Sequence, residues 1–439
     1  MDQSDRMGAG RIALFSLPVV LFQAIELAWR AYLPQHLIAT VGLSLGVTGL
    51  LMVAMRGMDA IADPIMGWMS DHVDTRYGRR KPWIMLGVPL VAIGALGLFL
   101  SGAGTTLMTI MLASVLLHLG YSLMVTPHGG WGLEIGRDAD ERTRLMSAKI
   151  WYASAGAIAL LLVIAGLERG LGVGKAGVAA TLGMMIALLA PLTVFPVIRF
   201  FKERPQPCPQ PQHGHQPITG SVRAVFANPL LRKPLALYLL LGLADAASAT
   251  CFLFLSDNVL QLHGWGATLL LIQPALALVT LPLWSRMSRR HGRERVLILA
   301  YGWQLIVTPF ALLLPVGNLP TMIGYMIARN LIWGVDYALL RAMVADAADR
   351  DIVQGANRSG LYYGLSSIVL KLAMGLGAGG AIWLMSLARF DAKATLLSQG
   401  AEQAVRLACA MPGLLGALAA LIILTPRPTP GLGTRAAST

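Results

Sequence analysis

Two carboxylates inside an apolar stretch have the clearest chemistry in this chain. Asp59 and Asp63 lie four residues apart, in a run that begins with Arg56 and ends with Pro64. In a helix, this spacing places both carboxylates on one face, about one turn apart. In lipid, an ionised carboxylate is costly unless it is paired or faces water. A membrane helix that keeps two of them is therefore predicted to bind something and not only to span the bilayer.

Composition indicates a protein that is embedded in a membrane. Charged residues make up 13% of the 439 residues and apolar residues 56%, whereas soluble domains carry about 25% charged residues. At about 20 residues a crossing, the chain has room for roughly a dozen helices. Its three cysteines are far apart, so they predict neither a metal site nor a disulfide framework. The net charge of +13 lies mostly in alternate loops, which is the signal of membrane topology and does not indicate a nucleic-acid partner.

Apolar stretches predict twelve transmembrane helices in an all-α membrane protein. Their approximate ranges are 12–38, 43–69, 83–102, 106–134, 145–167, 176–200, 233–257, 267–287, 295–315, 319–345, 360–386 and 404–425. The glycine-rich run at 377–380 predicts close packing between helices. Because basic residues gather in the loops after the second, fourth and eighth helices, both termini are predicted to be cytoplasmic.

The chain divides into two similar halves. Prolines at 205, 207, 209 and 211 exclude a helix and predict a cytoplasmic linker over 201–232. Six-helix bundles are then predicted over 1–200 and 233–439. The loop residues Arg76, Gly78 and Arg79 align without a gap with Arg290, Gly292 and Arg293. Two six-helix pseudo-repeats with a binding site between them form a transporter architecture.

The second helix and the loop after it carry a longer pattern. The run from Asp59 to Gly67, followed by Asp71, Arg76 and the segment 78–83, resembles the glycoside–pentoside–hexuronide:cation symporters of the major facilitator superfamily. The resemblance covers the whole chain and implies the major facilitator fold. It also implies that Asp59 and Asp63, with Ser122, bind a coupling cation, H⁺ or Na⁺, with no other cofactor or metal. Two carboxylates in a low-dielectric cavity disfavour joint ionisation unless a cation joins them.

Two basic residues are expected to balance those carboxylates. Arg56 lies one turn before Asp59, and Lys371 matches the lysine of the family's eleventh helix. The alternative is a static ion pair between these groups, and the two interpretations can coexist.

Departures from the family pattern concern the ion and the solute. Ala62 replaces an asparagine, which removes an amide oxygen that suits a hard cation and leaves H⁺ at least as well supported as Na⁺. Gln23 and Val125 stand where the family has carboxylates that bind galactosides, so a galactoside is not expected. The candidate solute-binding residues are Gln23, Arg30, Tyr121, Trp131 and Lys149. Arg30 has an alternative partner in Glu26, four residues earlier.

Charged residues at the cytoplasmic mouth predict a gate. They are Asp71, Arg76, Arg79, Arg80, Asp140, Glu141 and Arg142. Ion pairs that close this side in one state and part in the other form a two-state gate. The alternative is that these charges set topology and contact anionic lipid.

The sequence thus predicts a secondary transporter and no enzyme, because it lacks a phosphate-binding loop and a zinc-binding helix motif. We expect a multi-pass protein of the bacterial inner membrane that acts as a monomer. It would carry a small polar solute, sugar-like or acidic, together with H⁺ or Na⁺. A lysolipid or amphiphile transporter of the same fold is the alternative, and a sensor that no longer transports is a third interpretation.

Overall fold

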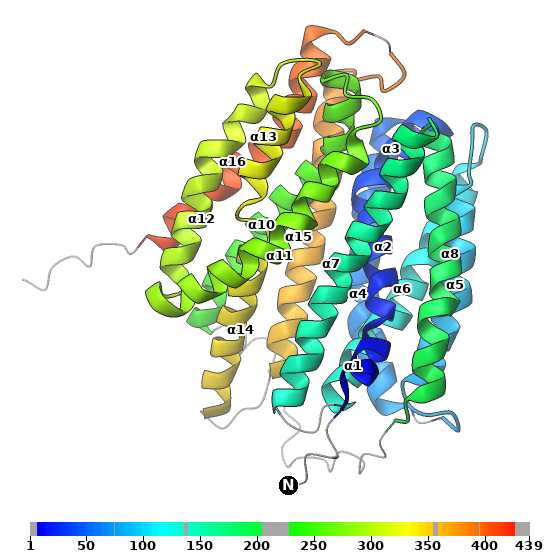
Figure 1. Cartoon of the computed structure of the whole chain (residues 1–439), viewed down its shortest axis with the longest axis vertical. Helices are drawn as coiled ribbons and strands as arrows, with labels where there is room; N and C mark the ends of the chain where they lie inside the picture. Colours follow the sequence, from blue (N-terminus) through cyan, green and yellow to red (C-terminus); the bar gives the residue numbers. More distant parts are fainter. Residues whose placement is uncertain are drawn as a thin grey trace, which may run out of the picture.

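The computed structural model is a bundle of long helices that run along the longest axis of the molecule (Figure 1). It describes residues 7–73, 75–135, 139–203, 228–353, 359–394 and 396–425. Within these ranges the only β-type pairing is an isolated bridge between Thr75 and Gly78. Large apolar side chains, such as Trp151 and Leu162, are exposed on the outer surface, as expected for a protein whose outer solvent is lipid.

The first half of the chain forms six rods. The first rod is α1 (Ala9–Ser16), α2 (Pro18–Leu27), the π-helix η2 (Ala28–Tyr32), α3 (Leu33–Gln35) and the π-helix η3 (His36–Val41). The next five are α4 (Leu45–His72), α5 (Lys81–Phe99), α6 (Leu107–Ile135), α7 (Ala139–Gly170) and α8 (Lys175–Phe200). The π-helical turns of the first rod were not predicted; such turns are frequent at functional sites.

The second half of the chain repeats this arrangement with more interruptions. Its helices are α10 (Pro229–Phe254) with the π-helix η4 (Leu255–Val259), α11 (Gly266–His291), α12 (Arg293–Val307) with the 3₁₀-helix η5 (Thr308–Leu313), α13 (Leu319–Asn330), α14 (Val335–Val353), α15 (Ser359–Leu387) and α16 (Gln399–Leu424). In Figure 1 these helices lie mainly on one side of the molecule and α1–α8 on the other.

The prediction of a continuous tenth helix over 319–345 is wrong. The described residues contain 11 helices that are long and apolar enough to cross a membrane, and the predicted tenth segment is split into α13 and α14. Gly334 in the break has a φ of +82°, a conformation that a side chain disfavours. The count of twelve continuous helices is therefore not met.

Two other predicted boundaries also change. Helix α7 begins at Ala139, so Asp140, Glu141 and Arg142 lie in its first turns and not in a loop. Helix α10 begins at Pro229, four residues before the predicted start of the second bundle. The proline-rich part of the predicted linker, 204–227, lies outside the described residues, so the two-bundle division stays a prediction.

Glycines set how closely neighbouring helices pack. A Cβ atom on Gly94 of α5 would lie 2.4 Å from the backbone nitrogen of Leu117 on α6, and one on Gly120 would lie 2.8 Å from the backbone nitrogen of Val91. Backbones this close require small residues at the contact. The contact fixes α6, which carries Ser122, against α5.

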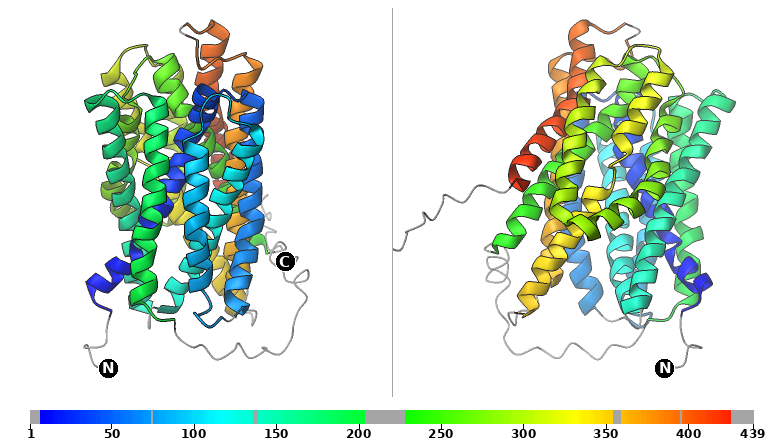
Figure 2. Two further views of the ribbon diagram at one scale, coloured as in Figure 1. Left: turned by 90° about the vertical axis from the view of Figure 1, so that its right-hand side faces the viewer. Right: turned by 60° about the vertical axis from the view of Figure 1, so that its left-hand side comes forward.

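The halves meet most closely along α4 and α15, which run side by side in both views of Figure 2. A Cβ atom on Gly379 would lie 2.8 Å from the backbone oxygen of Gly49 on α4, and one on Gly377 would lie 2.3 Å from the backbone oxygen of Leu243 on α10. Close packing at the 377–380 run is therefore confirmed. This contact brings Lys371 of α15 to the face of α4 that carries the acidic pair.

We predict that Gly94→Ala lowers the unfolding temperature of the purified protein. Overpacking a close contact costs about 1–3 kcal/mol, and here the new methyl group would meet the α6 backbone. The control is Gly302→Ala on α12, where nothing lies within 4 Å of the added Cβ atom; this protein should unfold at or above the parent temperature. An unfolding temperature of Gly94→Ala equal to that of the parent would contradict the close contact between the backbones of α5 and α6.

Candidate functional site

Asp59 lies at the centre of a buried charge network. Its side chain is fully buried, and its two oxygens have different partners. Oδ2 accepts a hydrogen bond from Nη1 of Arg56 at 3.1 Å, and Oδ1 lies 3.0 Å from Nδ1 of His118 on α6. The carboxylate thus has both a cation and an imidazole at hydrogen-bond distance, as a buried charge requires.

The sequence analysis missed His118. A lone histidine in an apolar helix carries no motif, but His118 lies four residues before Ser122, and this spacing places both on one face of a helix. Its ring is 4% exposed. Among the described residues its Nε2 atom has no hydrogen-bond partner, so the ring retains one unused nitrogen.

Arg56 joins the first rod to α4. Its Nη2 atom donates to Oε2 of Glu26 at 2.6 Å, and its Nη1 atom donates to Oε1 of Glu26 at 3.2 Å. A planar guanidinium suits this two-point contact with a carboxylate. The ring of Trp29 lies 3.9 Å from the guanidinium carbon and adds a cation–π contact. Glu26 therefore pairs with Arg56, and the predicted alternative pairing of Glu26 with Arg30 is not formed.

Asp63 is the more accessible member of the acidic pair. Its side chain is 18% exposed. Oδ1 accepts a hydrogen bond from the Ser122 hydroxyl at 2.7 Å, and Oδ2 forms an ion pair with Nζ of Lys371. Lys371 lies 308 residues further along the chain, so this pair joins the two halves. Three residues were predicted to surround the acidic pair. Each of them contacts one of its two carboxylates: Arg56 contacts Asp59, and Ser122 and Lys371 contact Asp63.

A second ion pair between the halves was not predicted. Nη1 of Arg30, in η2, donates to Oδ2 of Asp245 on α10 at 2.6 Å. The same carboxylate oxygen accepts a hydrogen bond from the hydroxyl of Tyr337 at 3.1 Å. Arg30, which was predicted to bind solute, is thus held by a carboxylate of the opposite half. No sequence pattern indicates this pairing, because the partners are 215 residues apart.

The other predicted solute residues are scattered. Gln23 is half-buried on α2, and Tyr121 is buried edge-on against Phe22, with 6.0 Å between ring centroids. Trp131 is 1% exposed and is packed edge-on against Phe15. This packing leaves no open indole face against which a solute ring could lie.

Lys149 lies next to the aromatic cluster and not next to the acidic pair. Its Nζ atom donates to the backbone oxygen of His128 at 3.4 Å and lies 5.3 Å from the ring centroid of Phe15. The side-chain contacts of Tyr121, Trp131 and Lys149 given above therefore all lie within the first half.

The predicted gate residues of the loop before α5 make contacts within their own half. The carboxylate of Glu203, just after α8, accepts hydrogen bonds from the backbone N–H groups of Arg79, Arg80 and Lys81 at 2.6–3.1 Å. Free N–H groups at a helix start favour a carboxylate. A Cβ atom on Gly78 would lie 2.7 Å from this carboxylate, so glycine is needed there.

The remaining gate residues have local neighbours or lie outside the described part. The Arg80 side chain is buried and donates to the backbone oxygen of Pro127. Arg76 stacks on Tyr77, and the Glu141 carboxylate accepts from the backbone nitrogen of Met7 at 2.8 Å. The side chains of Asp71, Asp140 and Arg142 lie outside the described residues. The gate stays a prediction.

The two carboxylates of the acidic pair contact basic side chains and a hydroxyl. Among the described residues, no group of three or more histidine, cysteine or acidic side chains could hold a metal ion. Asp63 is partly exposed, whereas Asp59 is fully buried. Protonating or freeing one carboxylate would change which ion pairs form between the halves.

The chain is similar to known transporters. The chain is 24% identical over 354 residues to the isoprimeverose transporter of Lactiplantibacillus pentosus, covering 76% of this chain and 71% of that protein. It is 23% identical over 373 residues to the glucuronide carrier protein homolog of Escherichia coli, covering 82% and 80%. These names do not favour the alternative of a lysolipid transporter.

The fold also matches solved transporters. A structure of the nucleoside transporter NupG superposes with a TM-score of 0.70, at 14% identity, over 94% of this chain and all of that one. This likeness concerns the fold alone. The model of the family described as "MFS/sugar transport protein" matches residues 14–426. The chain therefore belongs to this family of major facilitator transporters, which confirms the predicted resemblance to glycoside–pentoside–hexuronide:cation symporters.

Proposed function

We propose that this multi-pass membrane protein carries a sugar-like solute together with one proton. The proposal rests on one observation: the ion pairs around Asp59 and Asp63 contain one carboxylate more than they contain arginine and lysine side chains. Four carboxylates, Glu26, Asp59, Asp63 and Asp245, are joined to three basic side chains, Arg30, Arg56 and Lys371. With His118 neutral, one added monovalent cation makes the network electrically neutral. Buried groups that carry no net charge have the lowest electrostatic cost when the two halves rearrange in a low-dielectric environment.

A proton suits the site better than Na⁺. Both oxygens of Asp59 and both oxygens of Asp63 already have partners. Na⁺ would need several free oxygen ligands, since hard cations favour carboxylate, carbonyl and water oxygens. Ala62 supplies no such oxygen, and His118 supplies nitrogen. A proton requires only one acceptor atom, and either Asp63 or His118 provides it.

Asp63 is the group that we expect to load. It is partly exposed, whereas Asp59 is fully buried between Arg56 and His118. A proton on Asp63 removes the charge that holds Lys371 of the opposite half, so it weakens the ion pair between α4 and α15. Asp59 then serves to keep Arg56 and His118 in place behind the loading group. Loading would thereby bias the equilibrium between the two arrangements of the halves.

The orientation and partners follow from the same proposal. The basic loop before α5 and the helix α1 lie at the same end of the bundle in Figure 1, and by the positive-inside rule this end is cytoplasmic. The partners are then the solute and the surrounding lipid of a bacterial inner membrane. The monomer is the proposed unit of transport.

We predict that Asp63→Asn abolishes uphill accumulation of solute. The amide cannot take up or release the coupling proton, so accumulation of radiolabelled sugar in vesicles should fall at least ten-fold. Asp391→Asn is the control, because Asp391 is exposed in the loop after α15 and should leave accumulation unchanged. Accumulation by Asp63→Asn at the parent level would contradict the proposed loading group.

We predict that a pH gradient alone drives uptake. Proteoliposomes without sodium, acidic outside, should accumulate the sugar, and a protonophore should abolish the accumulation. Adding Na⁺ at constant pH should leave the rate within two-fold. Uptake that requires Na⁺ and ignores the pH gradient would instead assign Na⁺ as the coupling ion.

A further inference from the structure

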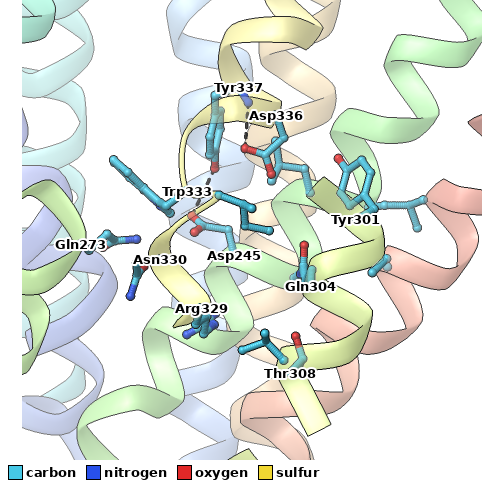
Figure 3. A pocket seen from close by; sticks show the side chains of 17 residues that line it. Asp245, Gln273, Tyr301, Gln304, Thr308, Arg329, Asn330, Trp333, Asp336 and Tyr337 are labelled. Carbon is cyan, nitrogen blue, oxygen red and sulfur yellow. Dashed lines mark hydrogen bonds between the residues drawn. The ribbon is translucent and has the colours of Figure 1, made fainter. Parts of the chain in front are cut away.

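A polar cavity lies in the second half, apart from the acidic pair on α4. It is bordered by α10, α12, α14 and α16 and by the break between α13 and α14 (Figure 3). Among the side chains that line it are Asp245, Tyr301, Arg329, Trp333 and Asp336.

The break in the tenth segment is stabilised by dedicated side chains. Nε1 of Trp284 donates to the backbone oxygen of Leu331 at 2.8 Å, and Nε1 of Trp303 donates to the backbone oxygen of Ala328 at 2.8 Å. These bonds satisfy carbonyls that the interrupted helix leaves without intrahelical donors. Irregular backbone at membrane depth is tolerated where it lines a cavity, and broken helices surround binding sites in transporters. The break is therefore a stabilised part of the wall of this cavity.

Two charges lie on either side of the break. Arg329 is in the last turn of α13, and Asp336 is in the first turn of α14. Helix dipoles favour a cation at a helix end and an anion at a helix start, so each charge is tolerated where it lies. No ion pair to either side chain is formed within the part of the chain that the structure describes. Asp336 accepts one hydrogen bond, from the backbone nitrogen of Tyr337 at 2.9 Å.

Two further polar groups in the cavity lack partners. The hydroxyl of Tyr301, a residue that is 4% exposed, and Nε1 of Trp333 have no hydrogen bond to any described residue. Leaving such a buried group unsatisfied costs about 1–3 kcal/mol. The cavity thus combines a carboxylate acceptor with hydroxyl, indole and guanidinium donors. Sugar hydroxyls, which both donate and accept, match this set.

We infer that this cavity binds the hydroxyl-bearing ring of the transported sugar. Asp336 accepts hydrogen bonds from ring hydroxyls, and Arg329 and Tyr301 donate to ring oxygens. The inference rests on the proposed function and names its solute site. It also accounts for Gln23 and Val125, which replace the carboxylates of the family's sugar site in the first half: the carboxylate that binds sugar is now on α14.

The cavity is joined to the proton site through Asp245. This carboxylate lines the cavity and accepts from both Tyr337 and Arg30. Arg30 lies one helical turn from Glu26, which binds Arg56. A sugar hydroxyl that bonds to Tyr337 or Asp245 therefore alters the same network that the proton completes, which provides a physical route for coupling.

The test is sugar binding by purified full-length variants, measured with 4-nitrophenyl β-D-xyloside and 4-nitrophenyl β-D-glucuronide as neutral and anionic probes. Asp336→Asn should weaken binding of whichever probe the parent binds at least ten-fold. Tyr301→Phe removes one oxygen atom only and should weaken binding about three-fold or more. Asp346→Asn, an exposed position on the same helix, is the matched control and should bind as the parent does.

The outcomes separate the inference from the proposed function. Parent-like probe affinity in Asp336→Asn and in Tyr301→Phe overturns the sugar site; the proposed function then stands if the parent still accumulates the probe with protons. Should Asp336→Asn fail to fold, the result for Tyr301→Phe decides alone. If the parent neither binds nor accumulates either sugar, both the proposed function and the inference are overturned.

Discussion

The buried guanidinium of Arg56 is the constraint on which the rest of the site depends. A charge with 1% exposure persists in a low-dielectric interior only when its partners are fixed. Glu26, Asp59 and Trp29 provide those partners from two rods of the first half. Once they are committed to Arg56, Asp59 is oriented towards His118, and Asp63, one turn further on, is the carboxylate left to face Lys371 across the boundary between the halves.

The ion pairs and the close glycine contacts both lie at the boundary between the two halves. Glycines on α15 allow its backbone to approach α4 closely, and this approach lets Lys371 reach Asp63. Arg30 and Asp245 make another ion pair between the halves. Ion pairs that are desolvated by close packing respond strongly to the loss of one charge. A transporter needs this sensitivity, because the free energy of loading must exceed the difference between the two arrangements.

Sequence patterns located the acidic pair but not its full surroundings. The spacing of Asp59 and Asp63, the long motif after them and the lysine of the eleventh helix all pointed to groups that the structure brings together. His118 and Asp245 carry no motif of their own, and their contacts depend on segments far apart in the chain. The break before Gly334 was missed because the apolar run continues through it. A tryptophan near a helix end, such as Trp131, looks the same in sequence whether it packs inward, as it does here, or faces a cavity.

The two polar regions of the molecule follow one electrostatic principle. In the ion pairs around Asp63, carboxylates outnumber arginine and lysine side chains by one, and the proposed proton site rests on this difference. Around the break in the tenth segment, Arg329 and Asp336 lie at separate helix ends without touching, and both line the cavity proposed to bind the sugar. Asp245 belongs to both regions. Because its oxygen already serves Arg30 and Tyr337, any ligand that recruits this carboxylate must change the field felt by Glu26 and Arg56. Coupling then requires no chain of moving residues between the two sites, because both sites share one carboxylate.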